Sequence, residues 1–248
     1  MKNSLKTFLA ICVAGATSLG ATNASAIQTS LELALLVDVS GSVDNTEYAL
    51  QKNGYINAFN DPTIQAAIAA RTGGIAVTYI EWSGATQQAQ LVNWTQITDA
   101  TSSSAFATAI GNTNRAFSGL TAPGSAINFA VPLFNNNFQG DRLVIDVSGD
   151  GQQNDGASTS AARDAALLAG INAINGLPIG GQTLATWYAN NIVGGATGFL
   201  VTASSFADFG NAVRTKIGRE ITEVPEPASL ALLGIGLAGL GMARRRKA

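Results

Sequence analysis

Apolar residues along the chain form short continuous runs, separated by segments in which they recur every three or four positions. The runs at 31–37, 75–82 and 143–147 are typical of strands that are buried on both faces of a sheet. Further elements are predicted as an edge strand at 89–94, short strands within 171–179 and at 199–202, and helices at 44–59, 62–68, 104–110, 125–134, 158–169, 184–190 and 206–217. Strands that alternate with helices predict an α/β fold, a doubly wound and mostly parallel sheet flanked by helices.

The predicted domain spans residues 27–222, with no internal repeat. Residues 1–26 contain Lys2 and Lys6, an apolar stretch, and the small-residue sequence Ala24-Ser25-Ala26. This order is typical of a secretory signal peptide. The alternative, a membrane-anchoring first helix, is disfavoured because the apolar stretch is too short to span a bilayer.

Residues 223–248 form a different kind of segment. The stretch 228–243 has no charge and is followed by the basic cluster 244–247. As a helix it would cover roughly 24 Å at about 1.5 Å per residue, less than the roughly 30 Å hydrocarbon core, and the basic cluster would stay on the cytoplasmic side. A short membrane anchor is the simplest interpretation.

The order Pro225-Glu226-Pro227, apolar helix and arginine cluster resembles the PEP-CTERM signal of bacterial surface proteins. The resemblance implies recognition by an exosortase-type membrane protease after transient membrane insertion of the C-terminal helix. It also implies that the processed protein is exported and is then released or attached at the cell surface or in the extracellular matrix.

Composition excludes several kinds of chemistry. The chain has no histidine, and its only cysteine, Cys12, lies in the predicted signal peptide. The mature chain therefore lacks disulfides, cysteine nucleophiles, histidine-based triads and His or Cys zinc sites. Residues 27–223 contain 8 Lys and Arg against 15 Asp and Glu, which argues against nucleic acid and anionic lipid as partners.

Polar residues gather where the predicted strands end. The first buried run ends at Asp38, with Ser40 and Ser42 after it; Thr121 precedes a helix, and Asp150 follows the run 143–147. Ligands of such sheets collect at the carboxyl ends of the strands. Two converging carboxylates with no basic residue in these loops need a cation, and carboxylate and hydroxyl oxygens favour Mg²⁺, with Mn²⁺ or Ca²⁺ as alternatives.

Each of these residues also has a simpler interpretation. Ser40 and Ser42 are typical turn or helix-cap residues, Thr121 is a candidate N-cap, and Asp150 is a candidate for an ordinary Asp-Gly turn. Those interpretations would leave two facing carboxylates without a neutralising charge. We therefore expect Asp38, Ser40, Ser42, Thr121 and Asp150 to hold one divalent cation.

Asp146 lies within the run 143–147 and begins the pattern Asp146-x-Ser148-x-Asp150-Gly151, which mimics an EF-hand loop. The twelfth position is Ala157, where an EF-hand needs a bidentate Glu. We expect Asp146 to support the ligands from a second layer around the cation, or to be a buried hydrogen-bonding partner.

The aromatic residues have two interpretations. They could form core and edge packing or a sugar-binding platform, and the residues concerned are Tyr79, Trp82, Trp94 and Trp187.

The three loops together resemble the metal-ion-dependent adhesion site of the von Willebrand factor A fold. Asp38, Ser40 and Ser42 match its D-x-S-x-S loop, Thr121 matches its threonine loop, and Asp150 matches its later aspartate. The stretches "DVSGSVD", "YIEWSG" and "VIDVSGDG" resemble more closely an uncharacterised bacterial branch of that fold, a domain of unknown function. The wider resemblance implies bound Mg²⁺ or Mn²⁺ whose coordination is often completed by a partner's carboxylate.

The predicted function is that of an exported, metal-dependent binding module for a carboxylate on a protein or an exopolysaccharide. A metal-assisted hydrolase is the first alternative, but such enzymes usually need a His or Glu base, and the three loops contain neither. A structural surface protein with a vestigial site is the second. We expect no enzymatic activity.

Overall fold

A computed structural model of the chain describes residues 26–223. It contains a central five-stranded sheet with the order β4-β3-β2-β6-β7. Its strands are β2 (Leu31–Asp38), β3 (Ile75–Trp82), β4 (Gln88–Ile97), β6 (Leu143–Gly149) and β7 (Ala173–Pro178). All neighbours pair in parallel except β3 and β4, which are antiparallel. The predicted α/β class, with a mostly parallel sheet and one edge strand, is confirmed.

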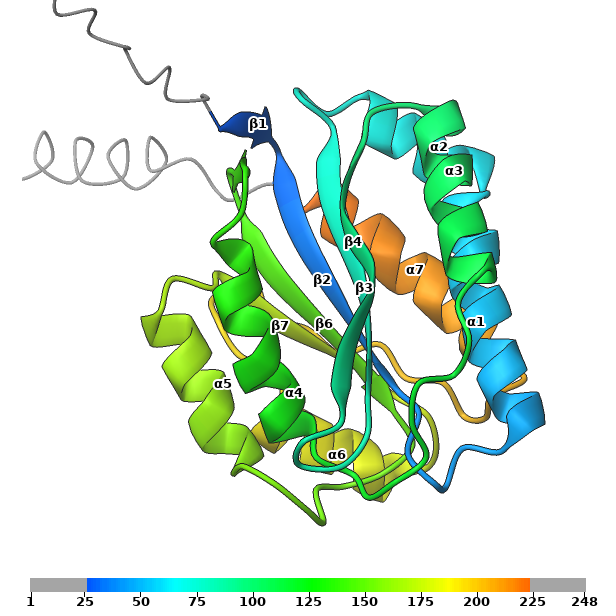
Figure 1. Cartoon of the computed structure of the whole chain (residues 1–248), viewed down its shortest axis with the longest axis vertical. Helices are drawn as coiled ribbons and strands as arrows, with labels where there is room; N and C mark the ends of the chain where they lie inside the picture. The colour runs from blue at the N-terminus through cyan, green and yellow to red at the C-terminus, as the bar shows by residue number, and fades with distance from the viewer. Residues whose placement is uncertain (1–25, 224–248) are drawn as a thin grey trace, which may run out of the picture.

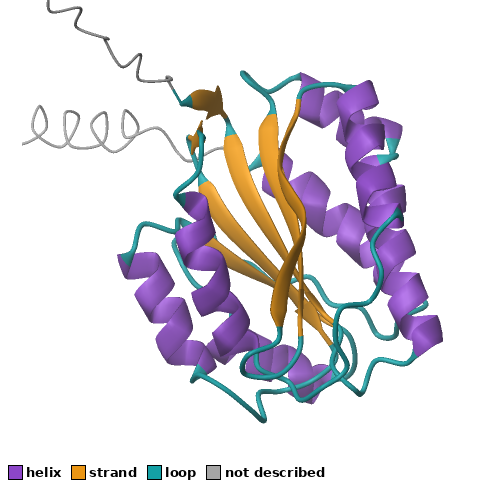
Figure 2. Ribbon diagram, in the orientation of Figure 1, coloured by secondary structure: helices purple, strands orange, loops and turns teal. Residues whose placement is uncertain are grey.

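Helices cover both faces of the sheet, as Figures 1 and 2 show. The helices on one face are α1 (Asn45–Phe59), α2 (Pro62–Ala69), α3 (Ala100–Gly111) and α7 (Phe209–Thr222). Those on the other face are α4 (Pro123–Ala130), α5 (Thr159–Leu168) and α6 (Gln182–Asn191). Every residue of β2 is buried, because alternate side chains enter the two cores that these helices form with the sheet.

Two predicted elements differ from the structure in kind, and two helices differ in their bounds: those expected at 104–110 and 206–217 are α3 and α7. The helix expected at 125–134 is α4 followed by a 3₁₀ turn, η1 (Val131–Phe134), since Pro132 has no N–H to continue the α-helical ladder. The strand expected at 199–202 is wrong. Leu200 and Ala203 form only single bridges to Gly176 and Ile179, beside β7.

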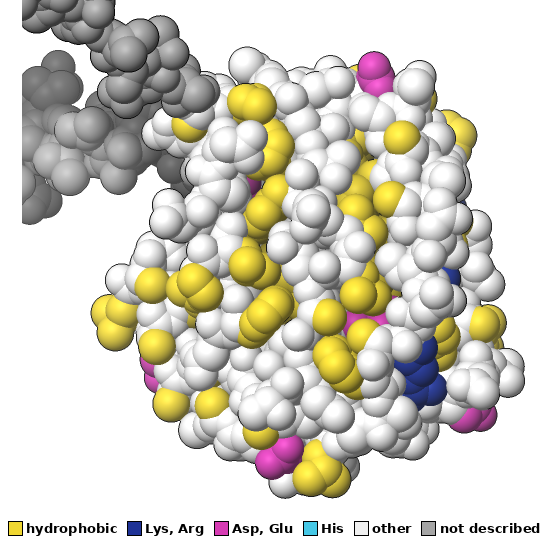
Figure 3. Space-filling model, viewed as in Figure 1, with side chains coloured by type: hydrophobic (Ala, Val, Ile, Leu, Met, Phe, Trp, Pro, Cys, Tyr) yellow, Lys and Arg dark blue, Asp and Glu magenta, His cyan; other side chains and the backbone are white. Residues whose placement is uncertain are grey.

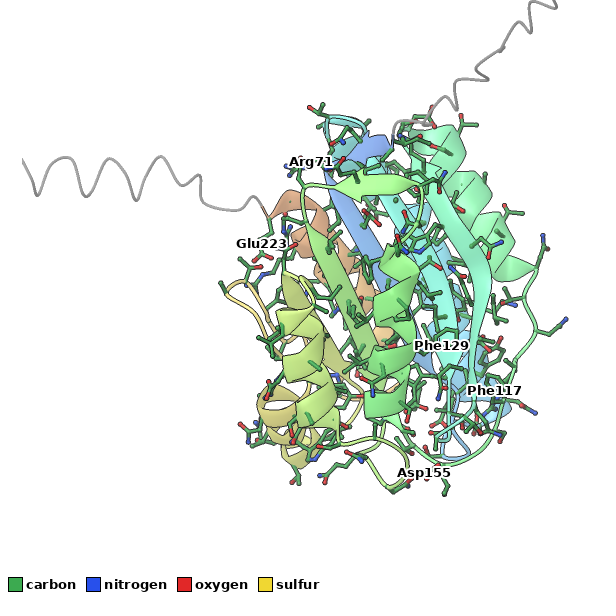
Figure 4. All side chains as sticks on the ribbon, turned by 60° about the vertical axis from the view of Figure 1, so that its left-hand side comes forward. Arg71, Phe117, Phe129, Asp155 and Glu223 are labelled. Atoms are coloured by element: carbon green, nitrogen blue, oxygen red, sulfur yellow. The ribbon has the colours of Figure 1, made fainter. Side chains whose placement is uncertain are left out.

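A small second sheet lies at the amino end of β2. It pairs β1 (Ile27–Thr29) in parallel with β5 (Phe138–Gly140), and three residues are too few for a recognisable alternation. The two ends of the described chain lie at this end of the molecule, opposite the carboxyl ends of β2 and β6 (Figure 1). Figure 4 shows the same separation, with Glu223 toward one end and Asp155 at the other.

Candidate metal centre

Asp38 is the last residue of β2 and is fully buried. Its Oδ1 atom accepts a hydrogen bond of 2.8 Å from the amide of Ser40, whereas Oδ2 has no hydrogen-bond partner among residues 26–223. Burial raises the pKa of Asp38 to about 7; the nearby Asp150 adds to the rise, and the bonds from Ser40 oppose it. An unpartnered buried carboxylate oxygen is costly, so this side chain has capacity for a further electropositive partner.

The loop after β2 reaches Asp150 through its serines. Ser42 Oγ donates to Asp150 Oδ1 over 2.8 Å, and the hydroxyls of Ser40 and Ser42 lie 3.2 Å apart. The N-cap of α1 is Asp44, so the alternative of a helix cap at Ser42 is wrong. The Asp150 carboxylate likewise serves more than a local turn, because it accepts from a residue far away in the sequence.

Thr121 approaches from the segment before α4. The N-cap of that helix is Ala122 and has no side-chain cap, so the alternative of Thr121 as an N-cap is also wrong. Thr121 is 5% exposed. A Cβ placed on Gly151 would lie 3.4 Å from Thr121 Oγ1, which puts the threonine hydroxyl against the residue that follows Asp150.

A backbone hydrogen bond joins the two loops directly. The amide of Gly41 donates to the carbonyl of Gly119 over 2.8 Å. Hydrogen bonds also join Asp38, Ser40, Ser42 and Asp150, and Thr121 contacts Gly151, the residue that follows Asp150. The fold brings the candidate ligands together at the carboxyl ends of β2 and β6.

The two carboxylates of this cluster form no ion pair with a basic side chain of the described residues. No salt bridge formed by residues 26–223 includes Asp38 or Asp150. That part of the chain also holds no group of three or more His, Cys, Asp and Glu with metal-binding placement. The donor set is therefore two carboxylates and hydroxyls. Such hard oxygen donors suit Mg²⁺ or Mn²⁺ and leave room for water or a partner's oxygen.

Asp146 lies on the face of the sheet that α7 covers. It forms an ion pair with Lys216 of α7, and Lys216 also lies 2.8 Å from Glu220. The side-chain amide of Asn175 donates to Glu220 over 2.9 Å, and all four residues are buried. We predicted that Asp146 belongs to a second layer around the cation. In the structure it contacts this buried cluster instead. The position is that of the alternative, a buried partner.

Two residues of the site region give no recognisable signal in the sequence. Asn154 lies four residues after Asp150, and its side-chain Oδ1 accepts from the Thr121 backbone amide over 2.8 Å, which fixes the threonine loop. Arg115 stands upstream of the threonine motif, where no local pattern connects it to Ser40, yet its guanidinium bonds the Ser40 carbonyl. Both contacts join segments distant in the sequence.

The aromatic side chains do not share one exposed platform. Tyr79 and Trp82 are fully buried and belong to the cores on opposite faces of the sheet. Trp94 packs against Phe134 and donates to a backbone carbonyl, while Trp187 packs against a buried neighbour in α6. Packing therefore accounts for them.

Comparison with known families matches residues 28–225 to the family described as Protein of unknown function (DUF1194). The chain belongs to this family. The predicted relation to an uncharacterised branch of the von Willebrand factor A fold is confirmed. No curated protein sequence matches this DUF1194 chain.

Solved structures with a similar fold share little sequence with this DUF1194 chain. Proximal thread matrix protein 1 from the mussel byssus is 18% identical, with a TM-score of 0.55, over 79% of this chain and 46% of that one. A further structure of the same mussel protein has a zinc-occupied metal-ion-dependent adhesion site (MIDAS) motif. A von Willebrand factor type A protein from Catenulispora acidiphila is 15% identical, with a TM-score of 0.55, over 78% of this chain and 43% of that one. The chain thus spans less than half of these proteins, and the likeness shows the von Willebrand factor A fold alone.

The C-terminal segment matches a second family. Residues 223–247 match the PEP-CTERM protein-sorting motif, as predicted, and this motif indicates an exported protein sorted to the cell surface or the extracellular space. Its predicted apolar helix, like the predicted signal peptide, lies outside the described residues. Between residues 26 and 223, no helix combines the length and apolar character needed to cross a membrane.

Proposed function

We propose that this protein is an exported binding module that grips a carboxylate of a protein or an exopolysaccharide through a divalent cation. Asp38, Ser40, Ser42, Thr121 and Asp150 would hold the ion. The observation that carries the proposal is the convergence of two carboxylates and the serine hydroxyls at one sheet edge, with neither carboxylate in a salt bridge with residues 26–223. A bound Mg²⁺, Mn²⁺ or Ca²⁺ would supply an electrophilic centre for the partner's oxygen.

The same residues favour binding over hydrolysis. Metal-assisted hydrolysis usually needs a general base next to the metal-bound water, and the sequence has no histidine. Glu47 acts electrostatically on Asp150, but its carboxylate accepts from the Asp44 amide in the capping box of α1. The two carboxylates of the site can therefore bind a cation, whereas Glu47 is already engaged in the helix cap and is not free to act as a general base.

Cation binding should stabilise the fold measurably. A ligand at a hundredfold excess over its Kd adds about 2.7 kcal/mol, which corresponds to a rise in Tm of roughly 5–10 °C for a domain of this size. The test is a thermal melt of the purified protein in EDTA and in millimolar Mg²⁺, Mn²⁺ or Ca²⁺. Asp38→Asn and Asp150→Asn should lose the rise.

Asp164→Asn is the matched control, because Asp164 is an exposed carboxylate on α5 that pairs with Arg163. It should keep the full rise. A wild-type protein whose Tm is the same in EDTA and in all three cations would refute the metal site. Capture of partners from native extracellular matrix in Mg²⁺, released by EDTA, then tests the carboxylate ligand.

We further propose that residues 1–26 are removed as a signal peptide and that the tail is cut after export by an exosortase-type protease. The motive is the order of basic, apolar and small residues at the first end and the sorting motif at the other. Intact-mass spectrometry of the protein from its own host should show a start near Ile27 and an end near Pro225. Exported protein that still carries residues 244–247 would contradict the processing.

A further inference from the structure

Arg115 binds the backbone of the loop that carries Ser40 and Ser42. It belongs to the segment between α3 and α4 and is partly buried. Its Nη2 atom donates to three carbonyls, which belong to Val39 at 2.9 Å, Ser40 at 2.9 Å and Val43 at 2.7 Å. Nη2 carries two hydrogens, so at least one of them is shared between two carbonyls. Hydrogen bonds from a charged donor are about twice as strong as neutral ones, and this one side chain holds three carbonyls of the loop around a single point.

These bonds orient the loop. The carbonyl of Ser40 faces the guanidinium, while the hydroxyl of Ser42 reaches Asp150. A loop that turned its carbonyls elsewhere would carry the serine hydroxyls away from Asp150. The guanidinium thus favours the one arrangement in which the candidate ligands converge.

Arg115 also shapes the segment that leads to Thr121. Its Nε atom donates to the carbonyl of Phe117 over 2.9 Å, which curls the chain toward Gly119, and Gly119 in turn accepts from the Gly41 amide. Figure 4 shows Phe117 at the same end of the molecule as Asp155. One guanidinium therefore bonds both loops of the candidate site.

The surroundings of Arg115 fix it in place. Its guanidinium carbon lies 5.7 Å from the centre of the Tyr48 ring, a cation–π distance. The Glu81 carboxylate accepts from the Tyr48 hydroxyl over 2.9 Å and from the amide of Ala116 over 2.8 Å. Glu81 thus anchors Tyr48, which stacks on Arg115, and Ala116, which follows Arg115 in the chain, so that the guanidinium has a fixed position from which to bond the loops.

We propose that Arg115 is a positioning residue, which holds the Ser40–Ser42 loop and the Thr121 loop in register and so sets the cation affinity without touching the ion. The inference rests on the proposed function. Some residues do not touch a metal ion but hydrogen-bond to its ligands and orient them. Their removal typically weakens metal affinity by 10–100-fold. Arg115 would have the same effect by bonding the backbone carbonyls of the loops that carry the ligands.

The first test measures Mg²⁺ and Mn²⁺ affinity by titration calorimetry. Arg115→Met keeps the length of the side chain but removes every donor, and should raise the Kd at least tenfold. Arg115→Lys keeps the charge but cannot bond both loops at once, so its Kd should lie between the two. Arg163→Met is the control, because Arg163 also bonds a backbone carbonyl, that of Asn190, and its Kd should stay within twofold of wild type.

The second test is hydrogen exchange of the full chain in EDTA. Arg115→Met should speed amide exchange in residues 39–43 and 117–121 at least tenfold, with exchange in α5 unchanged. If wild type binds Mg²⁺ and Arg115→Met binds it equally well, the positioning role is refuted and the proposed function stands. If wild type binds no cation, the proposed function fails, and unchanged exchange in Arg115→Met would then refute the ordering of the loops as well.

Discussion

Gly149, the last residue of β6, provides a sharp test of the position of Asp38. A Cβ at residue 149 would lie 2.5 Å from Asp38 Oδ2 and 2.8 Å from both Asp38 Cβ and the Tyr188 hydroxyl. Contacts this short do not occur between real side chains, so Gly149→Ala forces the neighbours to move. Asp38 and Tyr188 are fully buried, and Asp38 is also bonded to the Ser40 amide.

Overpacking of a well-packed interior costs about 1–3 kcal/mol, and we expect Gly149→Ala to fall in the upper half of that range. The buried carboxylate and phenol leave little room for relaxation. Since domains are typically stable by about 5–15 kcal/mol, the variant should still fold. Displacement of Asp38 should also weaken Mg²⁺ binding by about 10–100-fold, the usual effect of a change in the support of a metal ligand.

The assay is urea unfolding in EDTA, followed by Mg²⁺ titration of the folded variant. Gly210→Ala in α7 is the control, because a Cβ there meets nothing within 4 Å and alanine suits a helix better than glycine by about 0.5–1 kcal/mol. Wild-type unfolding free energy together with wild-type Mg²⁺ affinity in Gly149→Ala would show that Asp38 does not pack against residue 149.

The buried cluster beneath α7 yields two further predictions. Lys216→Met leaves two carboxylates without their cation and should cost about 3–5 kcal/mol in urea unfolding, whereas Arg214→Met, at an exposed surface pair, should cost about 1 kcal/mol or less; equal costs would contradict the buried ion pairs. Burial raises the pKa of Glu220 from 4.5 to about 7, so the folded state keeps a proton that the unfolded state loses. The unfolding free energy in EDTA should therefore fall as pH rises from 4.5 to 7, and Glu220→Gln should reduce that slope; an unchanged slope would show that Glu220 does not hold the proton.

The sequence predicts the fold well because continuous apolar runs in a parallel sheet leave a strong pattern. It also predicts the cluster at Asp38, Ser42 and Asp150, since strand ends of a parallel sheet meet at one edge. Lys216 and Glu220 could not be predicted in this way. An i, i+4 pair of opposite charges is usually a solvated helix face, and only the tertiary fold shows that both are buried against Asp146.

Arg115 illustrates a second limit. All of the acceptors of Arg115 are backbone carbonyls. Because every residue has a backbone carbonyl, the sequence gives no indication of which residues Arg115 bonds. The placement of Asp146 fails for a related reason. Its neighbours in the sequence suggest the same loop as Asp150, but the strand continues through Gly149, so Asp146 lies inside the sheet, where it pairs with Lys216 of α7.

The chain reaches the sorting motif at Glu223, at the opposite end of the sheet from Asp38 and Asp150. β2 alone, with 8 residues at about 3.3 Å each, spans roughly 26 Å between these ends. In a protein attached through this end, the proposed cation site would lie beyond the electrostatic reach of the surface to which the protein is attached, since the Debye length at physiological salt is about 8 Å. Few charged side chains are visible on the face shown in Figure 3. The affinity for an anionic partner would then be set by the cation in the site, and the charge of the lipid or polymer to which the protein is attached would have little effect.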